Sequence, residues 1–188
     1  MIKDSEQPVS PESIIDFWYS DRVKPQWFNS TPELDDEIRE RYELLWHNAA
    51  KGNYNDWCET AAGSLALVII LDQFPLNMYR GKPESFKTES QAVEFAKLAV
   101  EKQHDKSLPK DKLAFLYMPL MHSENLDDQD LSVRLFEQAD LKENARFANH
   151  HRDIVRRFGR FPHRNAILQR TSSQDELDYL NSKEAFKG

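Results

Sequence analysis

The chain has 188 residues, of which 32 are acidic and 25 are lysine or arginine, so its formal net charge is −7. At this length one domain, residues 1–188, can bury a core without a metal ion or a disulfide. The 39% of hydrophobic residues excludes general disorder, which we expect only at residues 1–9 and 187–188. The single cysteine, Cys58, favours a reducing cytoplasm, and we expect neither a signal peptide nor a membrane span.

Apolar residues recur at helical spacing along the chain, and capping signals mark where helices begin. Ser10-Pro11-Glu12 predicts a first helix that continues to Trp18. Thr31-Pro32-Glu33 repeats this signal, and Gly52 marks the end of the second helix. A third helix, expected from about Asp56 to Asp72, is apolar on every side near its end, which predicts the central buried helix.

The second half of the chain predicts further helices, one capped by Thr88 and one that starts at Pro109. Three more are expected at Asp130–Ala139, Leu141–Phe158 and Ser173–Phe186. No segment alternates between apolar and polar residues in the way that a strand requires. The sequence therefore predicts an all-α fold, a single compact domain of about eight helices packed as antiparallel helical hairpins.

Charge is distributed unevenly, because the segment from Arg146 to Arg170 holds seven arginines, no lysine and one acid, Asp153. This segment carries +6, so the remaining residues carry −13, which is −7 minus +6. Arginine suits bidentate pairing with carboxylate or phosphate, and it tolerates burial better than lysine does. The cluster predicts a pocket for an anion. The alternative is that the arginines only join the last helices to buried acids.

The turn inside this arginine cluster has the features of an anion site. Gly159 is expected to end the long helix in a left-handed turn, and Phe161-Pro162 to start a new helical turn. The first backbone N–H groups of that turn would then point outward without internal partners, which favours anion binding. The expected members of this cradle are Arg157, Arg160, His163, Arg164 and Asn165.

The stretch Asp72–Arg80, DQFPLNMYR, repeats this design, since Phe-Pro is expected to break the chain and Asn77 and Arg80 follow. Asp72 would lie at the negative end of a helix dipole, where a buried carboxylate needs a cation. We expect Asp72 to pair with one of the arginines in residues 157–164. An exposed Asp72 that simply ends the helix is the alternative.

A third polar cluster follows Pro119, which lies in an apolar helix, removes one backbone hydrogen bond and bends the chain. His122 and Glu124 come directly after it. In the helix expected at residues 141–158, His151 falls on the apolar face. It is then either a histidine of the core or a residue that contacts the ligand. Because neither His-Glu-x-x-His nor paired Glu-x-x-His motifs occur, we expect no metal site and no cofactor.

We expect the three clusters, centred on Asp72, His122 and Arg160, to meet around one shared cavity. The candidate ligand-binding residues are Asp72, Asn77, Arg80, His122, Glu124, His151, Arg157, Arg160, His163, Arg164 and Asn165. The candidates for moving a proton, if the site is catalytic, are His122, Glu124 and His163.

Four stretches together are similar to a known family: FWY…WF near the start, LALVIILDQFPLN, FLYMPLMHSE and HHRDIVRRFGRFPHRN. Over nearly its whole length the chain resembles the bacterial family catalogued as domain of unknown function 924. The resemblance implies a compact, all-helical, tetratricopeptide-like fold and a cytoplasmic setting, and it implies no particular activity. The chain departs from the family pattern at Leu76, where arginine is usual, and at Gln169, where glycine is usual.

Two functions are open at this point. The first is a pocket that binds a small anionic ligand, a phosphate or a carboxylate, and the residues do not decide whether it is also an enzyme. The second is an adaptor whose helical hairpins bind a peptide or protein partner. Nucleic acid is disfavoured as a partner, because the −13 carried by the rest of the chain repels a polyanion. No membrane partner is expected.

Overall fold

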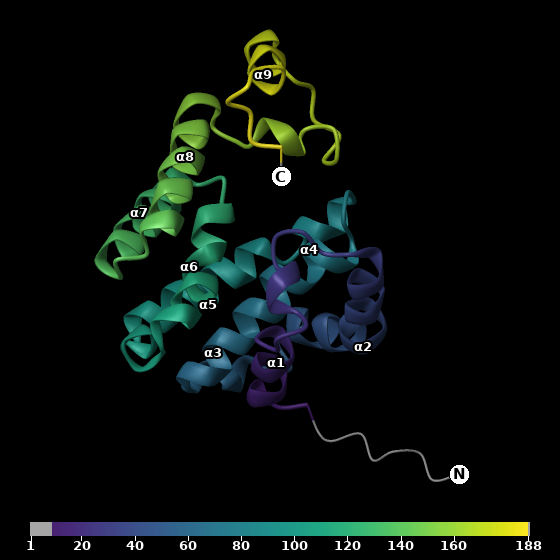
Figure 1. The fold of residues 1–188 in the computed structure, drawn as a ribbon, viewed down its shortest axis with the longest axis vertical. Coiled ribbons are helices and arrows are strands. Elements are labelled where there is room, and N and C mark those ends of the chain that lie inside the picture. Colours follow the sequence, from purple (N-terminus) through teal and green to yellow (C-terminus); the bar gives the residue numbers. More distant parts are fainter. Residues whose placement is uncertain (1–8, 188) are drawn as a thin grey trace.

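The computed structural model describes residues 9–187, and this part of the chain is helical with no strand (Figure 1). The predicted all-α fold is confirmed. The expected flexibility of the chain ends falls mostly on residues 1–8 and 188, which lie outside the described residues.

The first two helices begin where the capping signals predicted. Ser10 accepts the backbone N–H of Ser13, and Thr31 accepts that of Leu34. The helices of the described chain are α1 (Pro11–Trp18), α2 (Pro32–Ala50), α3 (Ala61–Val68), α4 (Phe74–Met78), α5 (Glu89–Glu101), α6 (Lys110–His122), α7 (Leu126–Gln138), α8 (Lys142–Phe158) and α9 (Gln174–Leu180).

Helices α3 and α4 form one continuous helix, joined by a π-helical turn at Ile69–Gln73. The predicted start near Asp56 is wrong, because residues 55–59 form a 3₁₀ turn and the helix begins after Thr60, which caps it. Gly63 permits this change of direction, since a Cβ atom there would lie 1.9 Å from the carbonyl oxygen of Trp57.

The predicted break at Phe74-Pro75 is also wrong, because the π turn accommodates the proline. Pro75 has no N–H to offer the carbonyl of Leu71. That carbonyl accepts the hydroxyl of Thr88 instead, at 2.6 Å, while the N–H of Phe74 bonds back to Ile69. The side chain of Thr88 therefore acts across the core and does not cap α5 as expected.

The continuous helix of residues 61–78 is the centre of the core, as the sequence predicted. Residues 63–75 are all buried. By length and composition alone this helix is apolar enough to cross a membrane, but 83% of it is buried inside the fold. It is therefore accounted for as a core helix surrounded by the other helices.

Helix α7 begins at Leu126, four residues before the predicted Asp130. The side chain of Asn125 accepts the backbone N–H groups of Asp127 and Asp128 and so caps an earlier start. The sequence analysis did not use this capping signal.

Helix α8 has its predicted extent, and Gly159 ends it with a left-handed φ of 70°. Helix α9 begins after a capping box at Ser173 but ends at Leu180, so the predicted extension to Phe186 is wrong. The segment after α9, residues 181–187, contains no helix.

A small apolar cluster lies apart from the main core, at the end of the molecule that carries α9 (Figure 1). Its buried members are Ile154, Val155, Phe161 and Tyr179, and Phe158, Leu180, Ala185 and Phe186 pack against them. The cluster holds the chain after α8 against that helix. This placement brings the arginine-rich turn next to the end of α6.

Candidate functional site

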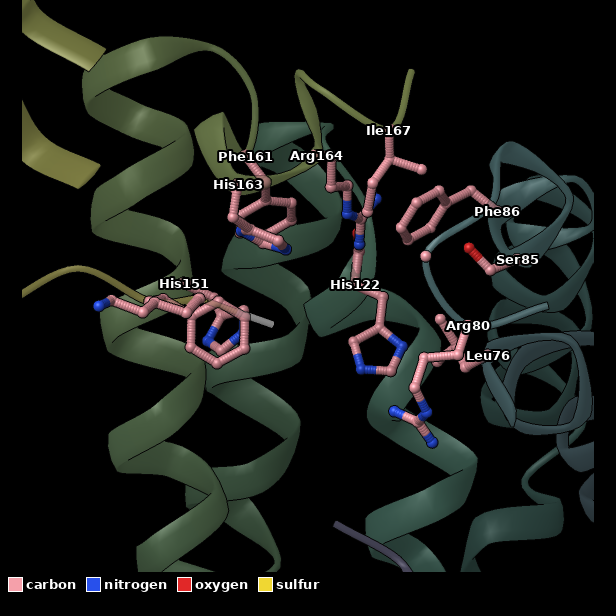
Figure 2. A pocket seen from close by; sticks show the side chains of 13 residues that line it. Leu76, Arg80, Ser85, Phe86, His122, His151, Phe161, His163, Arg164 and Ile167 are labelled. Carbon is pink, nitrogen blue, oxygen red and sulfur yellow. The ribbon is translucent and has the colours of Figure 1, made fainter. Parts of the chain in front are cut away.

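A pocket of about 390 Å³ lies where α4, the end of α6, α8 and the segment after α8 come together (Figure 2). Five of the eleven predicted ligand-binding residues line it: Arg80, His122, His151, His163 and Arg164. The other lining residues are Leu76, Gly81, Ser85, Phe86, Phe161, Ile167, Phe186 and Lys187. The expected convergence of distant polar segments on one cavity therefore holds for these five residues.

His122, which lines this pocket, forms a pair with the buried Asp72. Nδ1 of His122, in the last turn of α6, lies 2.9 Å from Oδ1 of Asp72 in the π turn. The carboxylate therefore keeps the proton on Nδ1 and leaves Nε2 as the other polar atom of the ring. The prediction that Asp72 pairs with an arginine is wrong, because the continuing helix presents it to α6.

Arg164 is the most enclosed cation of the pocket, with only 7% of its side chain exposed. Its Nη1 lies 2.8 Å from Oε2 of Glu89, and its Nη2 donates to the carbonyl of His122 at 2.8 Å. Its guanidinium lies 4.5 Å and 4.7 Å from the ring centroids of Phe86 and Phe161. The remaining donor, Nε, is buried and has no hydrogen-bond partner in the described chain.

Two of the three histidines in the pocket wall are uncharged at neutral pH. Burial lowers the pKa of His151 to about 3, and its Nδ1 lies 2.8 Å from the carbonyl oxygen of Phe147. Burial, with the positive charge of Arg164, lowers the pKa of His163 to about 4. Nδ1 of His163 is buried without a partner among residues 9–187. These rings therefore offer hydrogen-bonding atoms and flat apolar faces without adding charge.

Carboxylates hold the polar wall residues from behind. Asp72 pairs with His122, and Glu89 pairs with Arg164. In the same way Asp35 on α2 lies 2.9 Å from Nε of Arg80. None of these acids is among the described residues that line the pocket. The pocket wall therefore presents basic and imidazole groups, and the carboxylates that pair with them are not part of the lining.

Three other predicted residues do not line the pocket. Asn77 donates to Asp35 at 2.7 Å, and Asn165 donates to Ser172 at 3.0 Å. Arg157 is exposed on α8, with its guanidinium over the ring of the next residue. The expectation that Arg157 holds an anion in this pocket is therefore wrong.

Arg160 and Glu124 belong to ion pairs that fix the chain after α8. Nε and Nη2 of Arg160 bind Glu176 at 2.7 and 2.9 Å, and they lower the pKa of Glu176 to about 2. Arg170 binds Glu124 at 2.7 and 2.9 Å, and the N–H of Phe161 donates to the same carboxylate at 2.8 Å. The third cluster is therefore not centred on Arg160, and for this residue the alternative of a structural tie to a buried acid is correct.

The backbone cradle expected at Pro162 does not form. Pro162–Arg164 is a single 3₁₀ turn. The N–H groups of Arg164 and Asn165 donate to the carbonyls of Phe161 and Pro162 at 3.1 and 3.0 Å. Contacts to an anion at this turn would therefore come from side chains.

Glu89, Phe86 and Asp35 were not predicted from the sequence. Glu89 opens α5 and resembles an ordinary first-turn acid, which is favourable at any helix N-terminus. The need for a buried counter-charge to Arg164 was a usable signal. The position of Glu89, 75 residues before Arg164, could not be predicted from the spacing of residues.

The three candidate catalytic residues differ in what their contacts allow. His122 is a carboxylate-supported imidazole on the pocket wall, an arrangement suited to proton transfer. Glu124 is fully engaged by Arg170 and a backbone N–H. Within residues 9–187, no three His, Cys, Asp or Glu side chains are grouped so as to hold a metal ion.

A family model described as "Bacterial protein of unknown function (DUF924)" matches residues 14–184. The chain belongs to the DUF924 family. Among solved structures, the protein of unknown function ATU0120 from Agrobacterium tumefaciens is similar, with 36% identity and a TM-score of 0.86. The match covers 91% of the present chain and 96% of that one. No protein of curated function matches the chain. The similarity confirms the predicted family and its all-α fold.

Proposed function

We propose that this DUF924 protein binds a small anionic ligand, a phosphate or carboxylate compound, in the pocket between α4, α6 and α8. The charge of the wall carries the proposal. Among the described residues that line the pocket, Arg80, Arg164 and Lys187 are basic and none is acidic. In a chain with a net charge of −7, this excess of basic side chains favours the binding of an anion in the pocket.

The size and chemistry of the pocket support a small molecule as the ligand. A volume of about 390 Å³ lies in the range of ligand pockets, which are mostly apolar with a few placed polar groups. Leu76, Phe86 and Ile167 supply apolar surface, and His122 and Arg164 supply polar groups. If the bound anion is a substrate, the proton-transfer role falls to His122. We place the protein in the cytoplasm, since its single cysteine, Cys58, cannot form a disulfide within the chain.

The test changes the charge of the wall at Leu76, a half-buried residue of α4 that makes none of the ion pairs described above. We expect Leu76→Arg to tighten and Leu76→Glu to weaken the binding of inorganic phosphate. Each added charge contributes about 1 kcal/mol, or roughly fivefold in Kd. Isothermal titration calorimetry of phosphate into the wild type and both variants measures the change.

Leu44 provides the matched control, because it is an exposed leucine of α2 outside the pocket lining. Leu44→Arg and Leu44→Glu should leave phosphate affinity unchanged. An absence of phosphate binding in every variant, or equal effects at both positions, contradicts the proposal. The first of these results would favour the tetratricopeptide-like adaptor, which needs no small anion.

A further inference from the structure

One side of the pocket is a slot made of aromatic rings. The ring of Phe186 lies 4.4 Å from the imidazole of His151 and 5.0 Å from that of His163, measured between centroids. Phe161 lies 5.4 and 5.6 Å from the same two imidazoles. Two imidazoles, one from α8 and one from the turn after it, therefore contact the ring of Phe186, which comes from the segment after α9, and Phe161 packs against both imidazoles.

The slot carries no charge in spite of its histidines. Both imidazoles are neutral at physiological pH, because burial lowers the pKa of His151 to about 3 and that of His163 to about 4. The slot also adjoins the cation of the pocket, since Phe161, which packs against both imidazoles, lies 4.7 Å from the guanidinium of Arg164. A flat ring in the slot would thus have its substituent next to Arg164.

Phe186 is held in this slot by few interactions. It belongs to residues 181–187, which form no helix and of which residues 181–184 are exposed. Within residues 9–187, its one backbone hydrogen bond is the N–H that donates to the hydroxyl of Tyr179 at 2.9 Å. Release of Phe186 would therefore break one hydrogen bond and expose one ring, a small part of the core.

We infer that this slot is a subsite for the aromatic ring of the anionic ligand, and that the ring displaces Phe186. This inference rests on the proposed anion site. The ligand class it names is an aryl phosphate or an aromatic carboxylate, with its ring between His151 and His163 and its anionic group at Arg164. Phe186 then acts as a built-in competitor that occupies the slot in the free protein.

The experiment compares inorganic phosphate, phenyl phosphate and cyclohexyl phosphate by calorimetry. We expect Phe186→Ala to tighten phenyl phosphate at least about tenfold, because the ligand ring no longer competes with Phe186. Affinity for inorganic phosphate should not change, and cyclohexyl phosphate should gain less than phenyl phosphate. Phe28→Ala is the matched control, since that ring is 79% exposed and lies outside the pocket lining.

The wild-type protein gives a second readout that does not depend on how well the variant folds. Phenyl phosphate should shift the ring proton resonances of His151 and His163 in NMR spectra, through the ring current of the entering phenyl group. If phosphate binds but phenyl phosphate has no advantage in either protein, the aromatic subsite is overturned and the anion site stands. If neither compound binds, both are overturned.

Discussion

Arg160 and Arg164 stand four residues apart in one string, and each pairs with a glutamate, yet the two pairs differ in how completely they are bonded. Glu176 accepts two hydrogen bonds from Arg160 and one from the N–H of Ser173, and its pKa falls to about 2. Glu89 accepts one hydrogen bond, from Arg164, and burial raises its pKa.

We interpret the pair of Arg160 and Glu176 as a structural clamp, and the pair of Arg164 and Glu89 as part of a binding surface. The clamp around Arg160 uses its polar atoms within the protein and ties α9 to the turn after α8. The pocket pair leaves a buried donor of Arg164 without a partner. Arg164 also lines the pocket, whereas Arg160 does not.

The largest expected effect comes from removal of the buried cation. Arg164→Ala leaves Glu89 inside the fold with Asp72 nearby and no partner, and we expect a loss of about 3 kcal/mol in the free energy of unfolding. Arg160→Ala should cost less, because Glu176 keeps its bond from Ser173. Urea unfolding followed by circular dichroism measures both values.

A double variant provides the control for this comparison. Glu89→Gln combined with Arg164→Ala removes the unpaired charge and should recover part of the lost stability. A larger loss for Arg160→Ala than for Arg164→Ala would contradict the distinction between the two pairs.

A smaller effect is expected in the pH dependence of stability, with opposite signs for the two glutamates. The folded pKa of Glu176, about 2, is below its unfolded value, so its stabilisation is present above about pH 4.5 and is lost as the pH falls toward 2. The folded pKa of Glu89 is raised, so stability falls as the pH rises through the range above its unfolded value.

The measurement is urea unfolding of Glu176→Gln and Glu89→Gln across this pH range. The stability difference between wild type and Glu176→Gln should grow as the pH rises from 2 to 4.5. The difference between wild type and Glu89→Gln should shrink as the pH rises above the unfolded value of Glu89. Parallel curves for the two variants would show that the pairs are equivalent after all.

Local signals account for the parts of the fold that the sequence predicted. The caps at Ser10 and Thr31 and the left-handed Gly159 depend only on neighbouring residues, and each is found where expected. The π turn could not be predicted, because the hydroxyl that satisfies the carbonyl of Leu71 comes from Thr88 on another helix. Gln169, where the family usually has glycine, has a φ of 54°, so that departure marked a left-handed position.

Part of the candidate site could be predicted, because the composition of short segments indicates where charged and buried side chains lie. The arginine-rich string and the polar ends of two apolar helices pointed to His122 and Arg164, which both line the pocket. Glu89, the partner of Arg164, was not predicted, because pairing depends on tertiary contacts over 42 to 75 residues. Asp72 was expected to meet an arginine and instead meets the imidazole.

The most direct test of the anion site is an NMR titration of the wild-type protein with inorganic phosphate, observed at the histidine ring protons. His122 and His163 line the pocket, whereas His47 on α2 and His104 lie outside its lining and serve as internal controls. We expect saturable shifts for His122 and His163 and none for His47 or His104. Equal shifts at all four histidines, or none at any, would contradict it.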